Sequence, residues 1–356
     1  MIEIDGSMME GGGQILRMAL TYSALLQASI KIYNIRAGRE PPGLKPQHLA
    51  TVKAVAEVCR TRIEGLRVGS RELIFMPQPP KGGEYVFDIG TAGSISLLLQ
   101  CIAPILAFTD SNSKIIVKGG TAVNHSPTIP FLDRVVFESA RLMGLKAEIK
   151  TIREGFFPKG GGVVEAFVEP VEFLKPLILK ENPKIRLIEG ISACGRLPDH
   201  VSERQARSAE TILRNKGFRT GIEKVMARGD SAPFSPGSYI CLWLKGEGPV
   251  FMGADTLGVR GKPAEKVGAE AAESLLNQIE TGASVDFHTA DSLIIWCSLA
   301  EGESCFTASR LTAHISSAVE LARMMLNTRL EVEGEFGKPA KITCKGIGFM
   351  RELIAA

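Results

Sequence analysis

The same succession of expected elements occurs three times along the chain, and this repetition restricts the fold more than any other feature of the sequence. Each unit contains a helix, a strand, a polar turn, a second helix and two further strands. Apolar residues three and four positions apart indicate the helices, and alternating apolar residues indicate the strands. The units cover residues 14–77, 90–170 and 289–346. Since repeated units bury their apolar faces against one another, the pattern predicts a large α/β domain built from three units.

The stretch between the second and third units breaks this succession. It reads as a strand (residues 184–195), a helix (200–217), three strands (218–258) and another helix (263–282). These elements are sufficient for a small α/β domain of their own. We therefore expect a large domain formed by residues 1–182 and 283–356, interrupted by an inserted domain at residues 183–282.

Composition excludes several classes of protein. A net charge of +3 is too small for a protein that coats nucleic acid, so a polyanion must be bound by a local basic cluster. Seven cysteines without a CxxC pair argue against a disulfide framework and a zinc site, and indicate buried thiols in the cytoplasm. The polar, acidic first residues do not predict a signal peptide. The longest apolar run, residues 96–108, is too short for a membrane span.

Equivalent positions of three repeated units lie around a pseudo-threefold axis, so the three polar turns are expected to meet. Arginine side chains, an imidazole and glycine-rich backbone in one place suit a substrate that carries phosphate. The residues that the turns contribute are Arg36, Arg39 and Lys45 in the first, Asn124, His125 and Pro127 in the second, and Arg310 followed by His314 in the third.

Two glycine-rich stretches receive different interpretations. Glycines 11–13 follow Glu10 and directly precede a helix, where backbone N–H groups can approach an anion. A flexible turn explains these glycines equally well, and no Walker A motif follows them. Glu10 is a candidate contact for a metal or a ribose hydroxyl, with a solvated carboxylate as the alternative. Residues 153–162 lie between two strands, which favours a structural hairpin.

His314 is the candidate nucleophile. It lies at the edge of the apolar stripe formed by Ile315 and Val319, where a histidine is usually part of the core edge. Its place near the helix start, beside Arg310, favours a functional role. A neutral imidazole can attack phosphorus and carry a nucleotidyl group as a phosphoramidate, and neighbouring arginines keep it unprotonated. Asp291 is placed in the first turn of a helix, where a carboxylate is favoured with or without a function.

Several motifs together resemble the RNA 3′-terminal phosphate cyclase family. They are DGSMMEGGGQILR, IRAGREPPGLKPQHL, GTAGS followed by LLLQ, GGTAVNHSP and REGFFPKGGGVV. The last is similar to the family's Arg-Gly-x-x-Pro-x-Gly-Gly-Gly signature, with Glu154 as one extra residue. The likeness extends from Ile4 to about Gly348, which is nearly the whole chain.

The resemblance implies both a fold and a reaction. The fold is three α/β units, each a four-stranded sheet with two helices, and a smaller α/β domain inserted before the third. In the reaction, ATP adenylylates a histidine with loss of pyrophosphate, and AMP passes to the 3′-phosphate of an RNA. The vicinal 2′-oxygen then attacks, which gives a 2′,3′-cyclic phosphate and releases AMP. Mg²⁺ or Mn²⁺ assists.

The resemblance also implies roles for individual residues, all of them quoted from the matching motifs. The nucleophile is His314, and Glu10 is a metal or nucleotide contact. The implied nucleotide and phosphate contacts are Gln14, Arg17, Arg36, Arg39, Gln100, Pro127 and Asp291, together with His288 and Ser292, which stand where relatives often carry Tyr and Gln. These two departures weaken the expected stacking on adenine and remove an amide that reads the base.

Two other functions compete with the cyclase. The family includes a branch without the nucleophilic histidine that acts in ribosome assembly, and the presence of His314 favours the enzyme. Enolpyruvyl transferases share a related repeat fold, but they need no histidine nucleophile at this place. The helix at residues 200–217 is interpreted as an ordinary solvated helix, with an RNA-facing surface or a homodimer contact as alternatives.

Overall fold

The structure, a computed structural model, describes residues 1–352, and in that part the strands form four sheets. The first sheet has the order β1-β2-β4-β3, and two helices follow its first two strands. The last four residues of the predicted unit at 283–356 lie outside the described residues. The elements are β1 (Ile2–Asp5), α1 (Gly13–Leu26), β2 (Ile30–Tyr33), α2 (Pro46–Cys59), β3 (Arg62–Glu64) and β4 (Leu73–Met76).

The second sheet repeats this arrangement in the order β5-β6-β8-β7. As β1 does with β2, β5 pairs in parallel with β6 across a helical connection, and the remaining pairs are antiparallel. The sequence pattern missed β1 and β5, which are short and contain charged residues. The elements are β5 (Glu84–Asp88), α3 (Ile95–Leu106), β6 (Ser113–Gly119), α4 (Ile129–Phe131), the π-helical turn η1 (Leu132–Val136), α5 (Phe137–Met143), β7 (Lys146–Arg153) and β8 (Gly162–Glu169).

The third sheet departs from the expectation of four strands. It has three, in the order β13-β15-β14, and two isolated parallel bridges to β13, Ile178 with Cys305 and Val285 with Ala308, stand where the other sheets have a full first strand. Pairing does not continue past Val285, because the next residue, Asp286, caps the following helix. The elements are α8 (Phe287–Leu299), β13 (Glu301–Ala308), α9 (Ala313–Leu326), β14 (Leu330–Gly334) and β15 (Ala340–Ile347).

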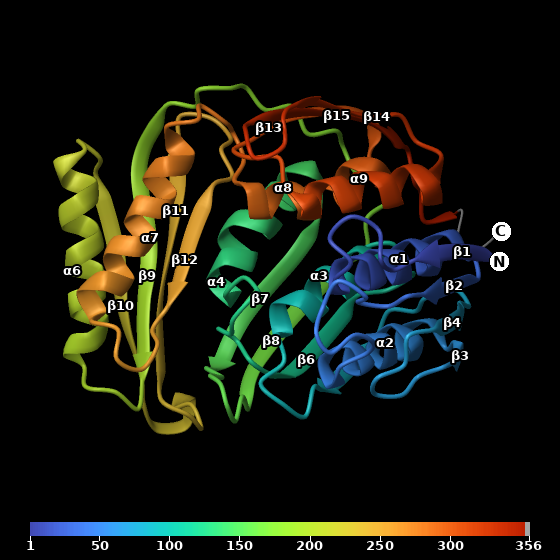
Figure 1. Cartoon of the computed structure of the whole chain (residues 1–356), viewed down its shortest axis with the longest axis horizontal. Coiled ribbons are helices and arrows are strands. Elements are labelled where there is room, and N and C mark those ends of the chain that lie inside the picture. The colour runs from blue at the N-terminus through green and yellow to red at the C-terminus, as the bar shows by residue number, and fades with distance from the viewer. Residues whose placement is uncertain (353–356) are drawn as a thin grey trace.

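The fourth sheet, in the order β10-β9-β11-β12, belongs to residues 185–279, named here the β9–α7 segment. Side chains alternate along β11, so Ile240 and Leu242 pack under α6 and α7, while Tyr239 and Trp243 join the main core on the other face. Figure 1 shows this segment beside the other three sheets. Its boundaries as a domain stay a prediction. The elements are β9 (Ile185–Gly195), α6 (His200–Asn215), β10 (Thr220–Ala227), the 3₁₀ turn η2 (Gly229–Ser231), β11 (Gly237–Gly246), β12 (Gly253–Leu257) and α7 (Ala264–Ile279).

The helices of the first three sheets pack against one another in the middle of the molecule, with α1 against α2, α3 and α9, and α8 against α9. Buried polar contacts fix these helices, among them Tyr22 Oη to Ser298 Oγ (3.0 Å) and Thr21 Oγ1 donating to the Cys101 carbonyl (2.9 Å). All seven cysteines are free, and six are buried. In residues 1–352 no helix combines the length and apolar character that crossing a membrane requires.

Candidate active site

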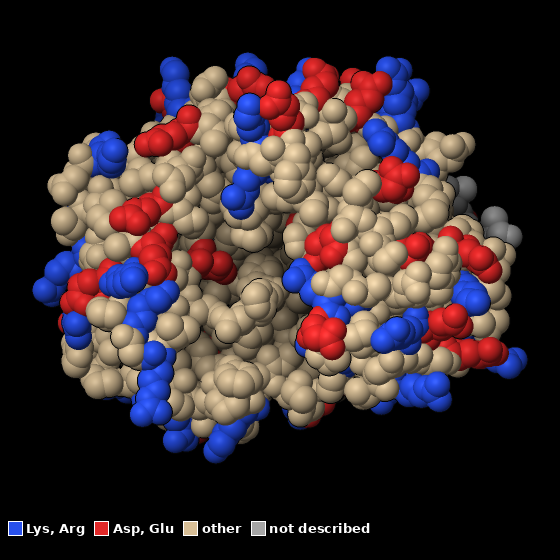
Figure 2. All heavy atoms as spheres, viewed as in Figure 1, with Lys and Arg blue, Asp and Glu red and all other residues tan. Residues whose placement is uncertain are grey.

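A cavity of about 620 Å³ lies where the first turns of five helices meet. Its lining includes residues from the starts of α1, α2, α3, α8 and α9, elements that belong to all three predicted units. The first turn of a helix presents unpaired N–H groups and the positive end of the helix dipole, which bind anions. The face shown in Figure 2 is hollowed at its centre, between the β9–α7 segment and the rest of the chain. The convergence suits a ligand with several phosphate groups.

Every residue to which the family resemblance gives a role lines this one cavity. The second turn also contributes Asn124 and His125, and the first contributes Lys45. Arg310 is the exception among the turn residues, because it lies outside the lining and stacks over the Phe287 ring at 4.1 Å. The predicted residues in the lining are Glu10, Gln14, Arg17, Arg36, Arg39, Gln100, Pro127, His288, Asp291, Ser292 and His314.

His314 is the second residue of α9, and its ring is held in one orientation. Its Nδ1 lies 2.7 Å from Gln14 Oε1, and because an amide oxygen only accepts hydrogen bonds, Nδ1 carries the proton. Nε2 therefore keeps its lone pair, 3.8 Å from Glu10 Oε1. Burial lowers the pKa of His314 below its usual 6.5; Glu10 opposes this shift, while Arg17 and Arg39 reinforce it. The ring is thus neutral near pH 7 and able to act as a nucleophile.

Glu10 is buried in the wall beside His314 and is paired on one side only. Its Oε1 accepts from Arg39, while Oε2 is buried without a hydrogen-bond partner. The carboxylate lies against the bare Cα of Gly12, where any Cβ would clash with both oxygens. The glycine run therefore makes room for Glu10 and starts α1 without a side-chain cap.

The implied Mg²⁺ or Mn²⁺ fits this carboxylate. Within residues 1–352 no three His, Cys, Asp or Glu side chains gather as a metal cluster. Mg²⁺ is commonly bound by one or two carboxylates, with substrate phosphates and waters completing its shell. The unpartnered Oε2 of Glu10 supplies such a ligand, so the donor set agrees with a cation that enters together with a nucleotide.

The first polar turn and the start of α2 bring Arg36, Lys45 and His48 to the cavity. Of these, only His48 had no role predicted from the sequence. Arg36 is buried, and its Nη1 donates to the carbonyls of Pro41 (3.0 Å) and Gly43 (2.8 Å), so it also shapes the turn. His48 Nδ1 accepts the N–H of Lys45 at 3.1 Å, which leaves its proton on Nε2. Burial, with Arg17, Arg36 and Lys45, lowers the pKa of His48 to about 3. A neutral donor therefore lines the cavity here.

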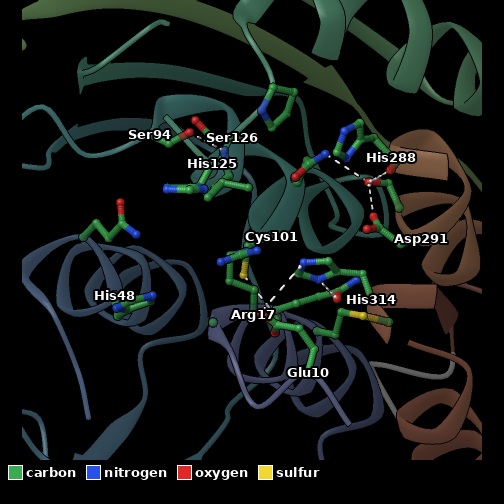
Figure 3. Close-up of a pocket in the computed structure, with 18 of the residues that line it drawn as sticks. Glu10, Arg17, His48, Ser94, Cys101, His125, Ser126, His288, Asp291 and His314 are labelled. Atoms are coloured by element: carbon green, nitrogen blue, oxygen red, sulfur yellow. Dashed lines mark hydrogen bonds and ion pairs between the residues drawn. The ribbon is translucent and has the colours of Figure 1, made fainter. Parts of the chain in front are cut away.

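The other side of the cavity is suited to a flat ring. Gln100 Nε2 donates to Ser292 Oγ (3.1 Å), and Ser292 in turn donates to Asp291 Oδ1 (3.1 Å). His288 is exposed to the cavity and leans on Phe287, with ring centres 4.0 Å apart; burial among the surrounding protein lowers its pKa to about 4. Figure 3 shows His288 and Asp291 on the side opposite His48. The apolar part of the lining here is formed by Leu97, Phe131, Val136, Ile295 and Trp296.

The placement of Asp291 in a first helical turn was wrong. The helix α8 begins at Phe287, so Asp291 is its fifth residue, and Asp286 is the cap that accepts from His288 N (2.8 Å) and Thr289 N (2.7 Å). Burial raises the pKa of Asp291 to about 7, and its hydrogen bond with Ser292 opposes the rise. Asp291 therefore lines the cavity instead of capping the helix.

The hairpin at residues 153–162 connects β7 and β8 and supplies no side chain to the cavity, in agreement with the structural role expected for it. By contrast, Asp255 of β12 lines the cavity and was missed. A lone Asp in a strand of the β9–α7 segment has no spacing or motif that signals a site. Only the packing of β12 beside the second unit brings it there.

Comparison with known proteins agrees with this geometry. The sequence profile of the RNA 3′-terminal phosphate cyclase family matches residues 8–332. Proteins named RNA 3′-terminal phosphate cyclase from Desulfurococcus amylolyticus and Methanopyrus kandleri are each 43% identical over 98% of this chain and 99% of their own length. One from Hyperthermus butylicus is 44% identical over 98% of both chains. This chain therefore belongs to the RNA 3′-terminal phosphate cyclase family.

Proposed function

We propose that this protein is an ATP-dependent RNA 3′-terminal phosphate cyclase, which converts an RNA 3′-phosphate to a 2′,3′-cyclic phosphate through an AMP-bearing His314. The observation that carries the proposal is the His314 ring itself. Its Nδ1–H is held by Gln14, its Nε2 lone pair is free, and the ring lies in a cavity formed by helix starts. A nucleophilic nitrogen in an anion-binding cavity is what nucleotidyl transfer requires.

The proposed reaction has three displacements at phosphorus. In the first, His314 Nε2 attacks the α-phosphorus of ATP; an N–P bond forms, the P–O bond to the β-phosphate breaks, and pyrophosphate leaves. In the second, an oxygen of the RNA 3′-phosphate attacks the same phosphorus and the N–P bond breaks, which gives RNA-pp-A. In the third, the 2′-oxygen loses its proton and attacks the 3′-phosphorus, and AMP leaves as the cyclic phosphate forms. Each step builds negative charge around phosphorus, which nearby guanidinium groups stabilise.

The side chains around His314 divide into two groups for this reaction. Arg17, Arg36 and Arg39 act on the phosphates, and the neutral His48 adds a hydrogen-bond donor. On the opposite side, the ring of ATP packs between Pro127 and His288. The polar chain of Gln100, Ser292 and Asp291 is then available to the ribose and the base edge.

Glu10 is the residue that would hold Mg²⁺ or Mn²⁺. Such a cation supplies charge neutralisation for the phosphate oxygens of the nucleotide. Without it, Glu10 pairs with Arg39. Arg39 lines the cavity, and its guanidinium group is therefore available to contact phosphate.

The fold expected from the family is part of the same proposal. We interpret the three sheets as copies of one α/β unit, the third with its first strand reduced to the bridges that Ile178 and Val285 form with β13. The β9–α7 segment is then an insertion between the second and third copies. A fold of this kind explains why helix starts that are far apart in sequence lie around one cavity.

Self-labelling tests the proposal directly. Incubated with ATP that is radiolabelled in the α-phosphate, the wild-type protein is expected to retain acid-labile, base-stable AMP, as a phosphoramidate does. Addition of an RNA with a 3′-phosphate should discharge the label and leave an RNA end that resists phosphatase. A matched RNA with a 3′-hydroxyl should leave the label in place. Absence of label on the wild-type protein, in the presence of Mg²⁺ or Mn²⁺, would refute the cyclase proposal.

The pH dependence of labelling follows from the state of His314. Only the neutral ring is a nucleophile, and the pKa of His314 is lowered below 6.5, so the acidic fall in the labelling rate should be centred below pH 6.5. Arg39→Ala removes a positive charge that lowers this pKa, so the acidic limb should move to higher pH. Initial labelling rates of the wild type and of Arg39→Ala, measured between pH 4.5 and 8 at steps of about half a unit, give the acidic limb of each protein. A wild-type limb centred above 6.5 would contradict the assignment.

A further inference from the structure

The segment of chain at residues 121–128 forms one wall of the cavity, through Asn124, His125, Ser126 and Pro127. We call it the wall loop. Its first residue, Thr121, donates its hydroxyl to Glu154 Oε2, and that hydroxyl accepts the N–H of Gly155 at 2.9 Å. Glu154 Oε1 accepts from the hydroxyl of Tyr239 in β11, at 2.9 Å. One buried carboxylate therefore joins the start of the wall loop to the β9–α7 segment.

A second carboxylate holds the other end of the wall loop. The N–H of Thr128 donates to Asp255 Oδ2 at 2.8 Å, and Asp255 belongs to β12, the strand next to β11. Thr128 is fully buried and caps α4. Without Asp255 its N–H would have no partner inside the protein. Both ends of the wall loop are thus tied to neighbouring strands of the same sheet.

The strand β12 also contacts the opposite wall of the cavity. The N–H of Gly253 donates to Asp286 Oδ2 (3.2 Å), and Asp286 caps α8, which carries His288 and Asp291. The Gly253 carbonyl accepts from Gln278 Nε2 of α7 (3.1 Å). Residues two positions apart on one strand therefore contact the wall loop on one side and the cap of α8 on the other.

Burial makes these contacts specific. Burial raises the pKa of both Glu154 and Asp255, since removal of a carboxylate from water opposes its charge. Such a group is tolerated only where donors compensate it. The donors here are Thr121, Tyr239 and Thr128, which come from the wall loop and the β9–α7 segment. A shift of the wall loop relative to the β9–α7 segment would leave a buried carboxylate or N–H unpaired. These hydrogen bonds therefore hold the loop and the segment in one relative position.

We propose that the β9–α7 segment is a positioning element of the nucleotide site, and that Asp255 is its principal positioning residue. It sets the distance between the wall loop and the first turn of α8, the two walls between which the ring of the nucleotide packs. This inference rests on the proposed function, because it assigns the gap between these walls to ATP. It predicts that loss of the Asp255–Thr128 hydrogen bond weakens ATP binding more than it slows transfer from bound ATP.

The test compares Asp255→Ala with two other variants of the full-length protein. Asp255→Asn keeps an oxygen that accepts the Thr128 N–H. Ser238→Ala is the matched control: Ser238 lies next to Tyr239 on β11, but it accepts from Gln205 of α6 on the face away from the cavity. The first measurement is the ATP concentration at which the initial rate of self-labelling reaches half of its maximum. The second is hydrogen exchange of the backbone amides at residues 121–131, without nucleotide.

Loss of a hydrogen bond to a charged group should raise the half-saturating ATP concentration of Asp255→Ala by about tenfold or more. Label at saturating ATP should stay near one AMP per chain. Exchange at residues 121–131 should accelerate in this variant, and Asp255→Asn and Ser238→Ala should resemble the wild type in both measurements. Unchanged half-saturation in Asp255→Ala, or an equal shift in Ser238→Ala, would overturn the inference. If the wild type takes no label, the proposed function fails, and the exchange measurement still decides whether Asp255 holds the wall loop.

Discussion

Replacement of His314 by asparagine is expected to abolish self-labelling with AMP and RNA cyclisation, each by about a thousandfold or more. An asparagine side chain retains an amide near Gln14 but offers no nitrogen lone pair to phosphorus. The His314 side chain is 43% exposed and makes one hydrogen bond, so the free energy of unfolding should change by less than about 1 kcal/mol. Labelling at saturating ATP and urea denaturation measure the two effects separately.

A surface change on the same helix serves as the control. Glu320 lies on α9 outside the cavity lining, and Glu320→Gln should label and cyclise like the wild type. Gln14→Leu removes the acceptor that fixes the His314 tautomer, so it should label more slowly while still labelling on His314. Recovery of AMP on another residue in His314→Asn would remove His314 from the central role; the other imidazoles in the lining are His48, His125 and His288.

Local patterns in the sequence predicted the long helices and the meeting of the polar turns, whereas lining residues such as Gln100 and Ser292 followed only from the family resemblance. The helices α1, α3 and α9 have apolar faces that are buried as the spacing indicates. The polar turns combine Gly, Pro and Arg, types that a buried helical core does not need. The repeated succession of elements then placed Arg39 and His314 at equivalent positions, and the structure brings both to one cavity.

Features that depend on contacts between distant parts of the chain were not predictable in this way. The strands β1 and β5 are defined by their pairing with β2 and β6, and with four and five residues they are too short for their own sequence pattern to indicate a strand. His48 and Asp255 have ordinary local surroundings and reach the cavity only through the packing of α2 and β12. The incomplete first strand of the third sheet has the same origin, since the two bridges to β13 come from Ile178 and Val285, which are far apart in the sequence.

Asp286→Ala should cause the largest loss of stability among the changes considered, about 3–4 kcal/mol in the free energy of unfolding. The carboxylate is fully buried and accepts four hydrogen bonds: from the N–H groups of His288 (2.8 Å), Thr289 (2.7 Å) and Gly253 (3.2 Å), and from the Thr289 hydroxyl (2.7 Å). Loss of a helix cap alone costs about 1 kcal/mol. The buried donors left without partners account for the rest.

The matched comparison is Thr312→Ala, which removes the cap of α9. Thr312 is only partly buried and accepts from the Ile315 N–H alone, so this variant should lose only about 1 kcal/mol. Asp286→Asn keeps one of the two side-chain oxygens at the cap and should fall between the two. Urea denaturation of the three variants gives the order. Equal losses in Asp286→Ala and Thr312→Ala would show that Asp286 acts only as a local cap. A larger loss of stability in Asp286→Ala than in Thr312→Ala would mean that Asp286 also joins β12 to the helix carrying His288 and Asp291. The same carboxylate then supports both the fold and the cavity.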